Sequence, residues 1–228
     1  MAHNIYYDEA AMAKAAAKGG HRRAVGGLWD EMGALQAEFL KRQGLRPEHR
    51  LLDVGAGALR AGRHLVDYLE PGHYFGADLS RALLDAGYDR ELTDAQRARL
   101  PRRNLVQTAD FDFSQISAPI DAALAQSVFT HLPLNHLRRC LHKLAPVMAP
   151  GGRFFVTYFE CPDDTPVTAL VTHPCQSGDP IVTTDYSDPF HYRADDMAWA
   201  CRGLDWTFER LGDWGHPRGQ LMGLYRRP

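Results

Sequence analysis

Glycines and acidic residues that could hold a small charged ligand lie close together in the first half of the chain. The segment LLDVGAG carries Asp53, Gly55 and Gly57, and Asp78 follows 21 residues after Gly57. Glycines at the end of an apolar run are typical of a tight turn from strand to helix, where backbone amides approach a bound cofactor. Asp78 ends a second apolar run, so its carboxylate can accept hydrogen bonds from both hydroxyls of a ribose. These residues predict a site for a nucleoside-containing cofactor.

The spacing of the glycines distinguishes three cofactor classes. A triphosphate site needs G-x-x-x-x-G-K-[S/T], whereas Gly57 and Gly62 are followed by Arg63 and His64. The dinucleotide pattern G-x-G-x-x-G meets Arg60 at its third glycine, which weakens that alternative and leaves it open. S-adenosylmethionine has no pyrophosphate and offers a carboxylate, an ammonium, a ribose diol and an adenine. The remaining pattern, D-x-G-x-G, favours it.

The amino-acid end of this cofactor has candidate partners in the glycine turn. The small residues Gly55, Ala56 and Gly57 let backbone amides close on that end. Asp53 can hold the ammonium, directly or through water, and Arg60, in the first turn of the next helix, can pair with the carboxylate. Pairing of Arg60 with a surface carboxylate is the alternative for that side chain.

The adenine end has candidate partners in the segment TADFDF, which follows the third predicted strand. Asp110 can accept a hydrogen bond from the adenine amino group, and Phe111 or Phe113 can lie against the ring face. Asp112 is the alternative acid, and strand register favours Asp110. A dehydrogenase would explain Asp78 but would leave the acid in TADFDF without a role.

The elements that carry these residues alternate along the chain. Apolar runs predict strands at 50–54, 74–78, 104–109, 120–126 and 154–159, and helical patterns lie between them at 60–69, 81–86, 94–100 and 133–148. Strands that alternate with helices at this spacing predict an α/β protein with a parallel sheet covered on both faces. The strand-like runs 206–210 and 221–226 have no helix between them, and they predict an antiparallel pair at the sheet edge.

Two segments lie outside this alternation. Helical periodicity at 8–18 and 25–39 predicts an N-terminal helical cap over residues 1–46, which leaves residues 47–228 as the cofactor-binding domain. Five prolines and little periodicity between 161 and 192 predict a lid or substrate-binding insertion at about 161–192.

The composition excludes several classes of protein. The 228 residues are 45% hydrophobic and 24% charged with a formal net charge of −2, which is ordinary for one globular domain and argues against a nucleic-acid partner. No run approaches the roughly 18 apolar residues of a membrane span, and Asp8 and Glu9 argue against a signal peptide. The four cysteines form no C-x-x-C pair, which favours free thiols in a cytoplasmic protein.

Five segments share their order and spacing with one protein family: LLDVGAG, YFGADLS, TADFDF, IDAALAQSVFTHL and PGGRFFVTYF. Through them residues 48–160 resemble the class I S-adenosylmethionine-dependent methyltransferases. The resemblance implies a Rossmann-like sheet of seven strands, mostly parallel with one antiparallel edge strand, helices on both faces and an N-terminal cap over the cofactor. It also implies cofactor contacts for Leu79, beside Asp78, and for Gln126, beneath the transferring methyl group. The variant LRAG and the segments DPFHY and GDWGHPRGQ are similar to a bacterial subgroup that acts on small molecules.

The candidate bases are histidines near residues 126–129, the segment that forms the floor beneath the transferring methyl group in the family. An imidazole with a pKa of about 6.5 can remove a proton near neutral pH. His131 follows the fourth predicted strand, and His191 lies in DPFHY. His216 is a further candidate, and a helix-start histidine bonded to backbone is the alternative for His131. The floor segment 126–129 lacks the Asn/Asp-Pro-Pro-Tyr/Phe motif of enzymes that methylate nucleobases.

The sequence therefore favours a methyltransferase that acts on a small-molecule O or N acceptor. Two alternatives stay open: an NAD(P)-dependent oxidoreductase and a non-catalytic protein that binds S-adenosylmethionine. His131, His136 and His142 are five and six residues apart, so a helix would point them in different directions and we expect no metal site. A monomer and a homodimer both fit the sequence.

Overall fold

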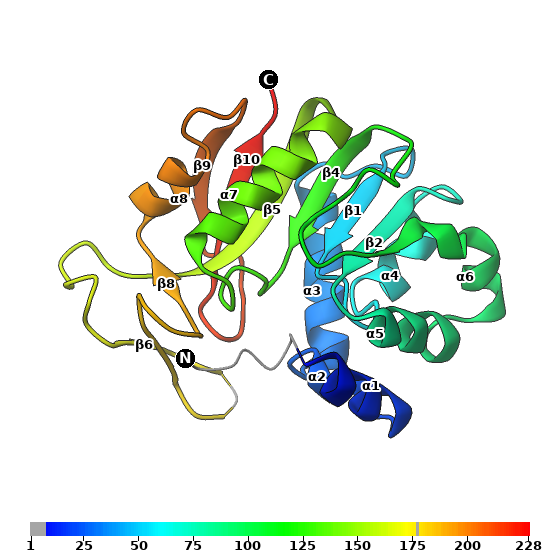
Figure 1. Ribbon diagram of the computed structural model, residues 1–228, viewed down its shortest axis with the longest axis horizontal. Coiled ribbons are helices and arrows are strands. Elements are labelled where there is room, and N and C mark those ends of the chain that lie inside the picture. The colour runs from blue at the N-terminus through cyan, green and yellow to red at the C-terminus, as the bar shows by residue number, and fades with distance from the viewer. Residues whose placement is uncertain (1–7, 177) are drawn as a thin grey trace.

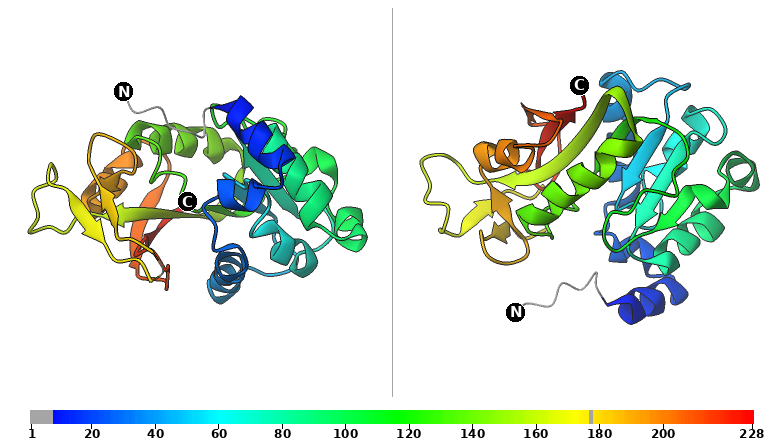
Figure 2. Two further views of the ribbon diagram at one scale, coloured as in Figure 1. Left: turned by 90° about the horizontal axis from the view of Figure 1, so that it is seen from below. Right: turned by 45° about the horizontal axis from the view of Figure 1, so that its top comes forward.

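A twisted β-sheet with helices on both faces forms the centre of the structure (Figures 1 and 2). The computed structural model describes residues 8–176 and 178–228. Seven strands follow one another across the sheet in the order β3-β2-β1-β4-β5-β10-β9. Their bounds are β1 (Leu51–Val54), β2 (Tyr74–Asp78), β3 (Leu105–Gln107), β4 (Ile120–Ala125), β5 (Met148–Glu160), β9 (Thr207–Gly212) and β10 (Leu221–Arg226).

The α/β prediction is confirmed, and one detail of the sheet differs. Strands β3, β2, β1, β4 and β5 run parallel, and β10 runs antiparallel to both β5 and β9. The antiparallel strand is therefore one place in from the edge, and β9 is the edge strand, whereas the sequence predicts an antiparallel edge strand. A hairpin can join a sheet through either of its strands, and hydrophobic patterning does not decide between them. An eighth strand, β8 (His191–Tyr192), pairs in parallel with the end of β5.

Helices enclose the sheet through two apolar clusters. Leu52 shares one cluster with α7 (Leu134–Leu144) and α8 (Ala194–Ala200), and Leu51 shares the other with α3 (Trp29–Arg42) and α4 (Gly62–Tyr68). Successive strand residues point to opposite faces, which places these two leucines in separate clusters. The remaining elements of this part of the chain are α5 (Arg81–Ala86), the π-helix Gly87–Glu91, α6 (Asp94–Arg99) and the 3-10 turns Arg102–Asn104 and Ala145–Val147.

The predicted helix over 133–148 ends early. Helix α7 stops at Leu144, and β5 begins at Met148 rather than at Phe154. Pro146 explains the difference, because a proline inside a helix lacks the amide hydrogen of the helical ladder and clashes with the preceding turn.

The N-terminal segment forms the helices α1 (Glu9–Ala17), α2 (His21–Ala24) and α3; Figure 1 shows α1 and α2 at the lower end of the sheet. Glu91 on the π-helix holds α2, because it accepts hydrogen bonds from His21 at 2.6 Å and from both Nε and an NH2 group of Arg22 at 2.8 and 2.7 Å. Its neighbour Arg90 donates to the carbonyl of Ala16 in α1 at 2.5 Å. The first two helices therefore dock on the π-helix through hydrogen bonds and charge.

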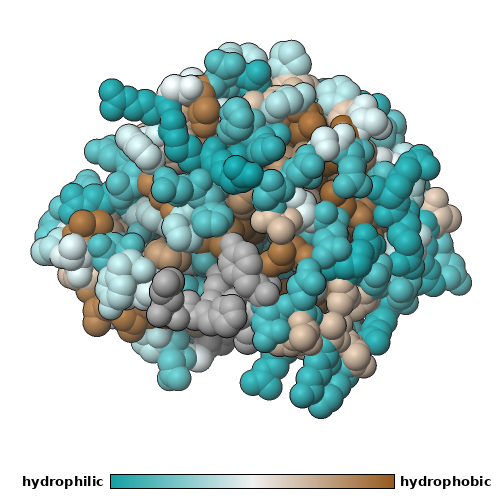
Figure 3. All heavy atoms as spheres, viewed as in Figure 1, coloured by the Kyte–Doolittle hydropathy of each residue, from teal (hydrophilic) through white to brown (hydrophobic). Residues whose placement is uncertain are grey.

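Residues 161–192 contain short strands where the sequence predicts an insertion with little periodicity. Strand β6 (Val171–His173) pairs antiparallel with β7 (Ile181–Thr183), and β8 follows. Three large side chains of this segment are exposed: Leu170, Val182 and Tyr186. The face of the molecule seen in Figure 3 is mostly hydrophilic. Within the described residues, no helix has both the length and the apolar character needed to cross a bilayer.

Candidate active site

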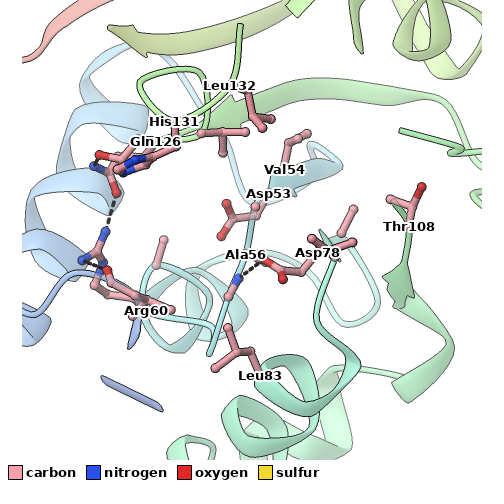
Figure 4. A pocket seen from close by; sticks show the side chains of 18 of the residues that line it. Asp53, Val54, Ala56, Arg60, Asp78, Leu83, Thr108, Gln126, His131 and Leu132 are labelled. Atoms are coloured by element: carbon pink, nitrogen blue, oxygen red, sulfur yellow. Dashed lines mark hydrogen bonds between the residues drawn. The ribbon is translucent and has the colours of Figure 1, made fainter. Parts of the chain in front are cut away.

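A cavity lies at the carboxyl ends of β1, β2 and β4, where the sequence predicts the cofactor. In Figure 4, Asp53 and Asp78 lie near the middle of this cavity, with Gln126 and His131 on one side and Thr108 on the other. The structure thus brings most of the predicted site residues together. Those that line the cavity are Asp53, Gly55, Ala56, Gly57, Arg60, Asp78, Leu79, Phe111, Gln126 and His131.

The glycine turn after β1 is required by both conformation and space. Gly55 and Gly57 have φ angles of +76° and +53°, in the left-handed region that other residues adopt at a cost. A Cβ atom at Gly57 would lie 2.5 Å from Val25 Cγ1, and one at Gly55 would overlap Val128 Cγ2. The turn therefore keeps its backbone open to the cavity only with glycine at both positions.

Asp78 is fixed in the cavity wall by backbone amides. Its two carboxylate oxygens accept one hydrogen bond each, from the Gly57 N–H and from the Ser80 N–H, both at 2.8 Å. Burial raises the pKa of the Asp78 carboxyl, and these amides oppose the rise. Ser80 caps α5 through the Leu83 N–H at 3.3 Å, so the aspartate is not needed as the cap. The carboxylate remains available to a diol, as predicted for the ribose.

Asp53 is a buried carboxylate whose charge is only partly compensated. Burial raises its pKa to about 6, opposed by a hydrogen bond from the Tyr74 hydroxyl at 2.7 Å and by the charge of Arg60. A cation placed beside this carboxylate would favour its ionised form and would replace the water lost on burial.

Arg60 connects the glycine turn to the N-terminal helices. It lies just before α4, which begins at Gly62, rather than within the first helical turn as predicted. Its guanidinium donates to the carbonyls of Val25 and Gly27 at 3.0 and 2.9 Å and to Oε1 of Gln126. Arg60 therefore contributes positive charge to the cavity while it holds the loop between α2 and α3.

Gln36 on α3 is a site residue that the sequence analysis missed. Its side chain is buried, lines the cavity, and has no hydrogen-bond partner for Oε1 among the described residues. A buried carbonyl oxygen without a donor is costly, and a bound ammonium would supply one. The available signal was a polar residue on the apolar face of α3, between Met32 and Phe39.

The residues of the cavity offer a partner to each part of the predicted cofactor except the adenine. An unpaired buried oxygen and a buried carboxylate can take the ammonium, the glycine turn leaves room for the amino-acid end, and Asp78 can take the ribose diol. The cavity therefore fits S-adenosylmethionine.

The predicted adenine partner Asp110 lies outside the cavity, which corrects that prediction. Its carboxylate is half-exposed and forms an ion pair with Arg139 at 2.8 Å. Asp112 is exposed as well, and it accepts the Ser114 N–H at 3.0 Å. Between them Phe111, with a φ angle of +63°, turns its own side chain inward, so the two flanking carboxylates point away. The polar residue that borders the cavity here is Thr108, which precedes the segment's acids.

The two histidines predicted as bases have different positions. His131 lines the cavity, and its Nδ1 donates to the carboxylate of Asp188 at 2.6 Å. His191 is 1% exposed and lies outside the cavity, which corrects its predicted role. Its Nε2 donates to the carbonyl of Val167 and its Nδ1 accepts from the Thr183 hydroxyl, both at 2.8 Å. Pairing of β8 with β5 turns His191 into the packed segment 161–192.

Known proteins share both a sequence domain and the fold with this chain. Residues 52–154 match the family model described as a methyltransferase domain. In fold the chain is similar to the S-adenosylhomocysteine complex of DhpI, with 16% identity and a TM-score of 0.64 over 100% of this chain and 98% of that chain. The matched domain and the shared fold favour the methyltransferase prediction over the oxidoreductase alternative, and the cavity lining fits S-adenosylmethionine.

The chain is also similar in fold to two N-methyltransferases. A sugar N-methyltransferase from Streptoalloteichus has 22% identity and a TM-score of 0.60 over 86% of this chain and 87% of that chain. The glycopeptide N-methyltransferase MtfA, in complex with S-adenosylhomocysteine, has 16% identity and a TM-score of 0.61 over 86% of this chain and 90% of that chain.

A second cavity adjoins the first and shares Val25, Arg60, Gln126, Ser127 and His131 with it. Its other walls come from segments far apart in the sequence: Gly26 and Leu28 before α3, Met32 on α3, Phe159 on β5, Ile181 and Pro189 in segment 161–192, and His216, Arg218 and Gln220 before β10. His131 therefore stands where the two cavities meet.

Burial makes His216 a weak base. It is 5% exposed, and burial together with the charges of Arg218 and Arg60 lowers its pKa to about 3. A histidine with so low a pKa is a poor proton acceptor near neutral pH. His216 instead accepts the backbone N–H of Arg218 at 3.1 Å and fixes the turn that carries it.

Proposed function

We propose that the protein is a class I S-adenosylmethionine-dependent methyltransferase that methylates a small molecule at an oxygen or nitrogen atom, with His131 as the general base. The observation that carries the proposal is the position of the His131–Asp188 pair, at the junction between the cofactor cavity and the second cavity. A base must reach both the acceptor and the transfer site, and His131 is the described histidine that lines both cavities.

Asp188 determines which nitrogen of His131 can act. Because Nδ1 donates to Asp188, Nε2 is the nitrogen that accepts a proton in that tautomer. The carboxylate also stabilises the imidazolium that forms when Nε2 takes the proton. When bound, S-adenosylmethionine supplies an electrophilic methyl carbon whose bond to sulfur breaks, with the electron pair left on sulfur, as the acceptor atom bonds to it. Orientation in two adjoining cavities supplies part of the acceleration, up to about 7–11 kcal/mol in favourable cases.

The proposed function includes roles for the predicted cap and lid. We assign residues 1–46 as the cap over the cofactor, supported by Gln36 and by Val25, which line its cavity. We assign residues 161–192 as the lid over the acceptor, supported by Ile181 and Pro189, which line the second cavity. The predictions for residues 1–7 fall outside the described residues.

We further propose a cytoplasmic bacterial enzyme without a nucleic-acid partner, acting as a monomer or a homodimer. The net charge of −2 supports the absence of a nucleic-acid partner. The absence of a C-x-x-C pair among the four cysteines of the sequence supports a reducing compartment.

The test is the pair of variants His131→Gln and Asp188→Asn, with His142→Gln as the matched control on the exposed face of α7. S-adenosylhomocysteine binding would be measured by calorimetry, and turnover by its release in a screen of small hydroxy compounds and amines. We expect His131→Gln to lower kcat about 10²–10⁴-fold, Asp188→Asn to lower it less, and all three variants to bind S-adenosylhomocysteine like the original. Turnover that survives His131→Gln would reject the base, and binding without turnover of any acceptor would favour the non-catalytic alternative.

A further inference from the structure

The second cavity carries positive charge and has no acidic residue in its described lining. Arg218 and Arg60 both reach it, and none of the described residues that line it is Asp or Glu. Residues 1–7 and 177, which the structure does not describe, are MAHNIYY and Ser and contribute no carboxylate to the chain. An acceptor bound here therefore meets guanidinium groups without a compensating carboxylate from the lining.

Arg218 is held in place without an ion pair. Its guanidinium donates to the carbonyl of Gly26 at 2.6 Å, and its backbone N–H donates to His216 Nδ1. Among the described residues it forms no salt bridge, unlike Arg139 and Arg210, which pair with Asp110 and Glu160. A guanidinium has five N–H donors, so this one keeps donors for a ligand.

Gln220 adds a second donor, because its neighbours fix the orientation of its amide. Ser127 N–H donates to the Thr157 hydroxyl, which in turn donates to Gln220 Oε1 at 2.7 Å. The Ser127 hydroxyl accepts from Gln126 and donates to the same Oε1 at 2.9 Å. The carbonyl oxygen of Gln220 is thus taken by two hydroxyl donors, which leaves its NH2 group to the cavity that it lines.

We propose that the acceptor carries an oxyanion, a carboxylate or a phosphate, that binds Arg218 and the Gln220 amide, and that it is methylated at a hydroxyl oxygen facing His131. The proposal rests on the proposed function and narrows its acceptor. An ammonium group would lose its hydration among arginines and find no carboxylate in the described lining, which disfavours a cationic amine. The oxyanion is not consumed, and the proton of the methylated hydroxyl goes to Nε2 of His131. A guanidinium can donate two parallel hydrogen bonds to a carboxylate or a phosphate, which the point charge of a lysine ammonium does not do.

The experiment compares acids with their neutral counterparts. The panel contains 4-hydroxybenzoate with 4-hydroxybenzamide, lactate with lactamide, and sn-glycerol 3-phosphate with glycerol, so that the carboxylate and phosphate arms separate the two sources of the oxyanion. Each compound is titrated into the protein saturated with S-adenosylhomocysteine, and each is assayed for methylated product with S-adenosylmethionine. Three variants accompany the original: Arg218→Gln, Arg218→Lys, and Arg103→Gln as a control at an exposed arginine outside both cavities.

We expect at least one acid to bind roughly tenfold or more tightly than its neutral counterpart, and Arg218→Gln to abolish that preference. Arg218→Lys should restore part of it, and Arg103→Gln should leave it unchanged. Equal binding of acids and neutral counterparts, or no binding by any of them, overturns the proposal, as does a preference for acids that survives Arg218→Gln. The affinity for S-adenosylhomocysteine distinguishes failure of the oxyanion proposal from failure of the proposed function. If this affinity is retained while a neutral or amine acceptor is methylated, the oxyanion proposal fails and the proposed function stands.

Discussion

The two adjoining cavities are built in different ways. The cofactor cavity takes its principal groups from two consecutive strand ends, residues 53–60 and 77–79, and its fixed charges there include the buried carboxylates of Asp53 and Asp78. The second cavity takes its walls from six separated stretches of chain, and its described lining contains Arg60 and Arg218 without an acidic residue. One cavity is local and suited to a ligand with an ammonium and a diol, and the other is long-range and suited to an anion. Apart from the residues that they share, the two cavities therefore depend on separate parts of the molecule.

The largest expected effect tests whether the glycine turn alone determines cofactor binding. Gly57→Ala would force a side chain to a φ angle of +53° and place its Cβ 2.5 Å from Val25, while Gly57 N–H must still reach Asp78. We expect the Kd for S-adenosylhomocysteine to rise about 100-fold or more, measured by calorimetry. Gly72→Ala is the matched control, because Gly72 has a φ angle of +83° with nothing within 4 Å of its Cβ position. It should cost about 1–2 kcal/mol of stability and leave the Kd unchanged; equal loss of binding in both variants would contradict the argument.

The same contrast explains what the sequence could predict. Strands 74–78 and 120–126 and the residues of LLDVGAG and YFGADLS were predictable, because glycines, acids and strand ends lie within a few positions of one another. The order of β9 and β10 was not, since the pattern of a hairpin is the same whichever strand joins the sheet. Asp188 and Arg218 reach the site only through tertiary structure, 57 positions from His131 in the first case. The early end of α7 was predictable from Pro146 and was missed.

An effect of intermediate size is expected for Asp53→Asn, which removes a buried charge from the cofactor cavity. The pKa of Asp53, about 6, lies above its value of 3.8 in an unfolded chain, so the folded state holds the proton more tightly. Stability from this group is present below pH 4 and is lost as the pH rises to 6, by about 3 kcal/mol in all. We therefore expect Asp53→Asn to be more stable than the original protein at pH 7.5 in urea unfolding, with the difference shrinking to near zero at pH 4.

Binding should change in the opposite direction in that variant. At pH 7.5 Asp53→Asn should bind S-adenosylhomocysteine about tenfold more weakly, because the ammonium loses its carboxylate partner. In the original protein, binding should weaken below pH 6 as Asp53 takes up a proton, and this dependence should be absent from the variant. A variant that is both less stable and unchanged in binding would show that Asp53 serves packing rather than the cofactor.

The smallest expected effect separates an acid at the surface from an acid in the cavity. Asp110 is exposed and paired with Arg139, and exposed pairs of this kind contribute about 0–1 kcal/mol. Asp110→Asn should therefore leave the Kd for S-adenosylhomocysteine within about twofold of the original, whereas Asp78→Asn should raise it about tenfold or more. Both substitutions remove one charge from the end of a neighbouring strand, so only their position relative to the cavity differs between them. If Asp110→Asn weakened binding as much as Asp78→Asn does, the segment TADFDF would have to turn its acid inward around the bound adenine, and the inward position of Phe111 would not describe the bound state.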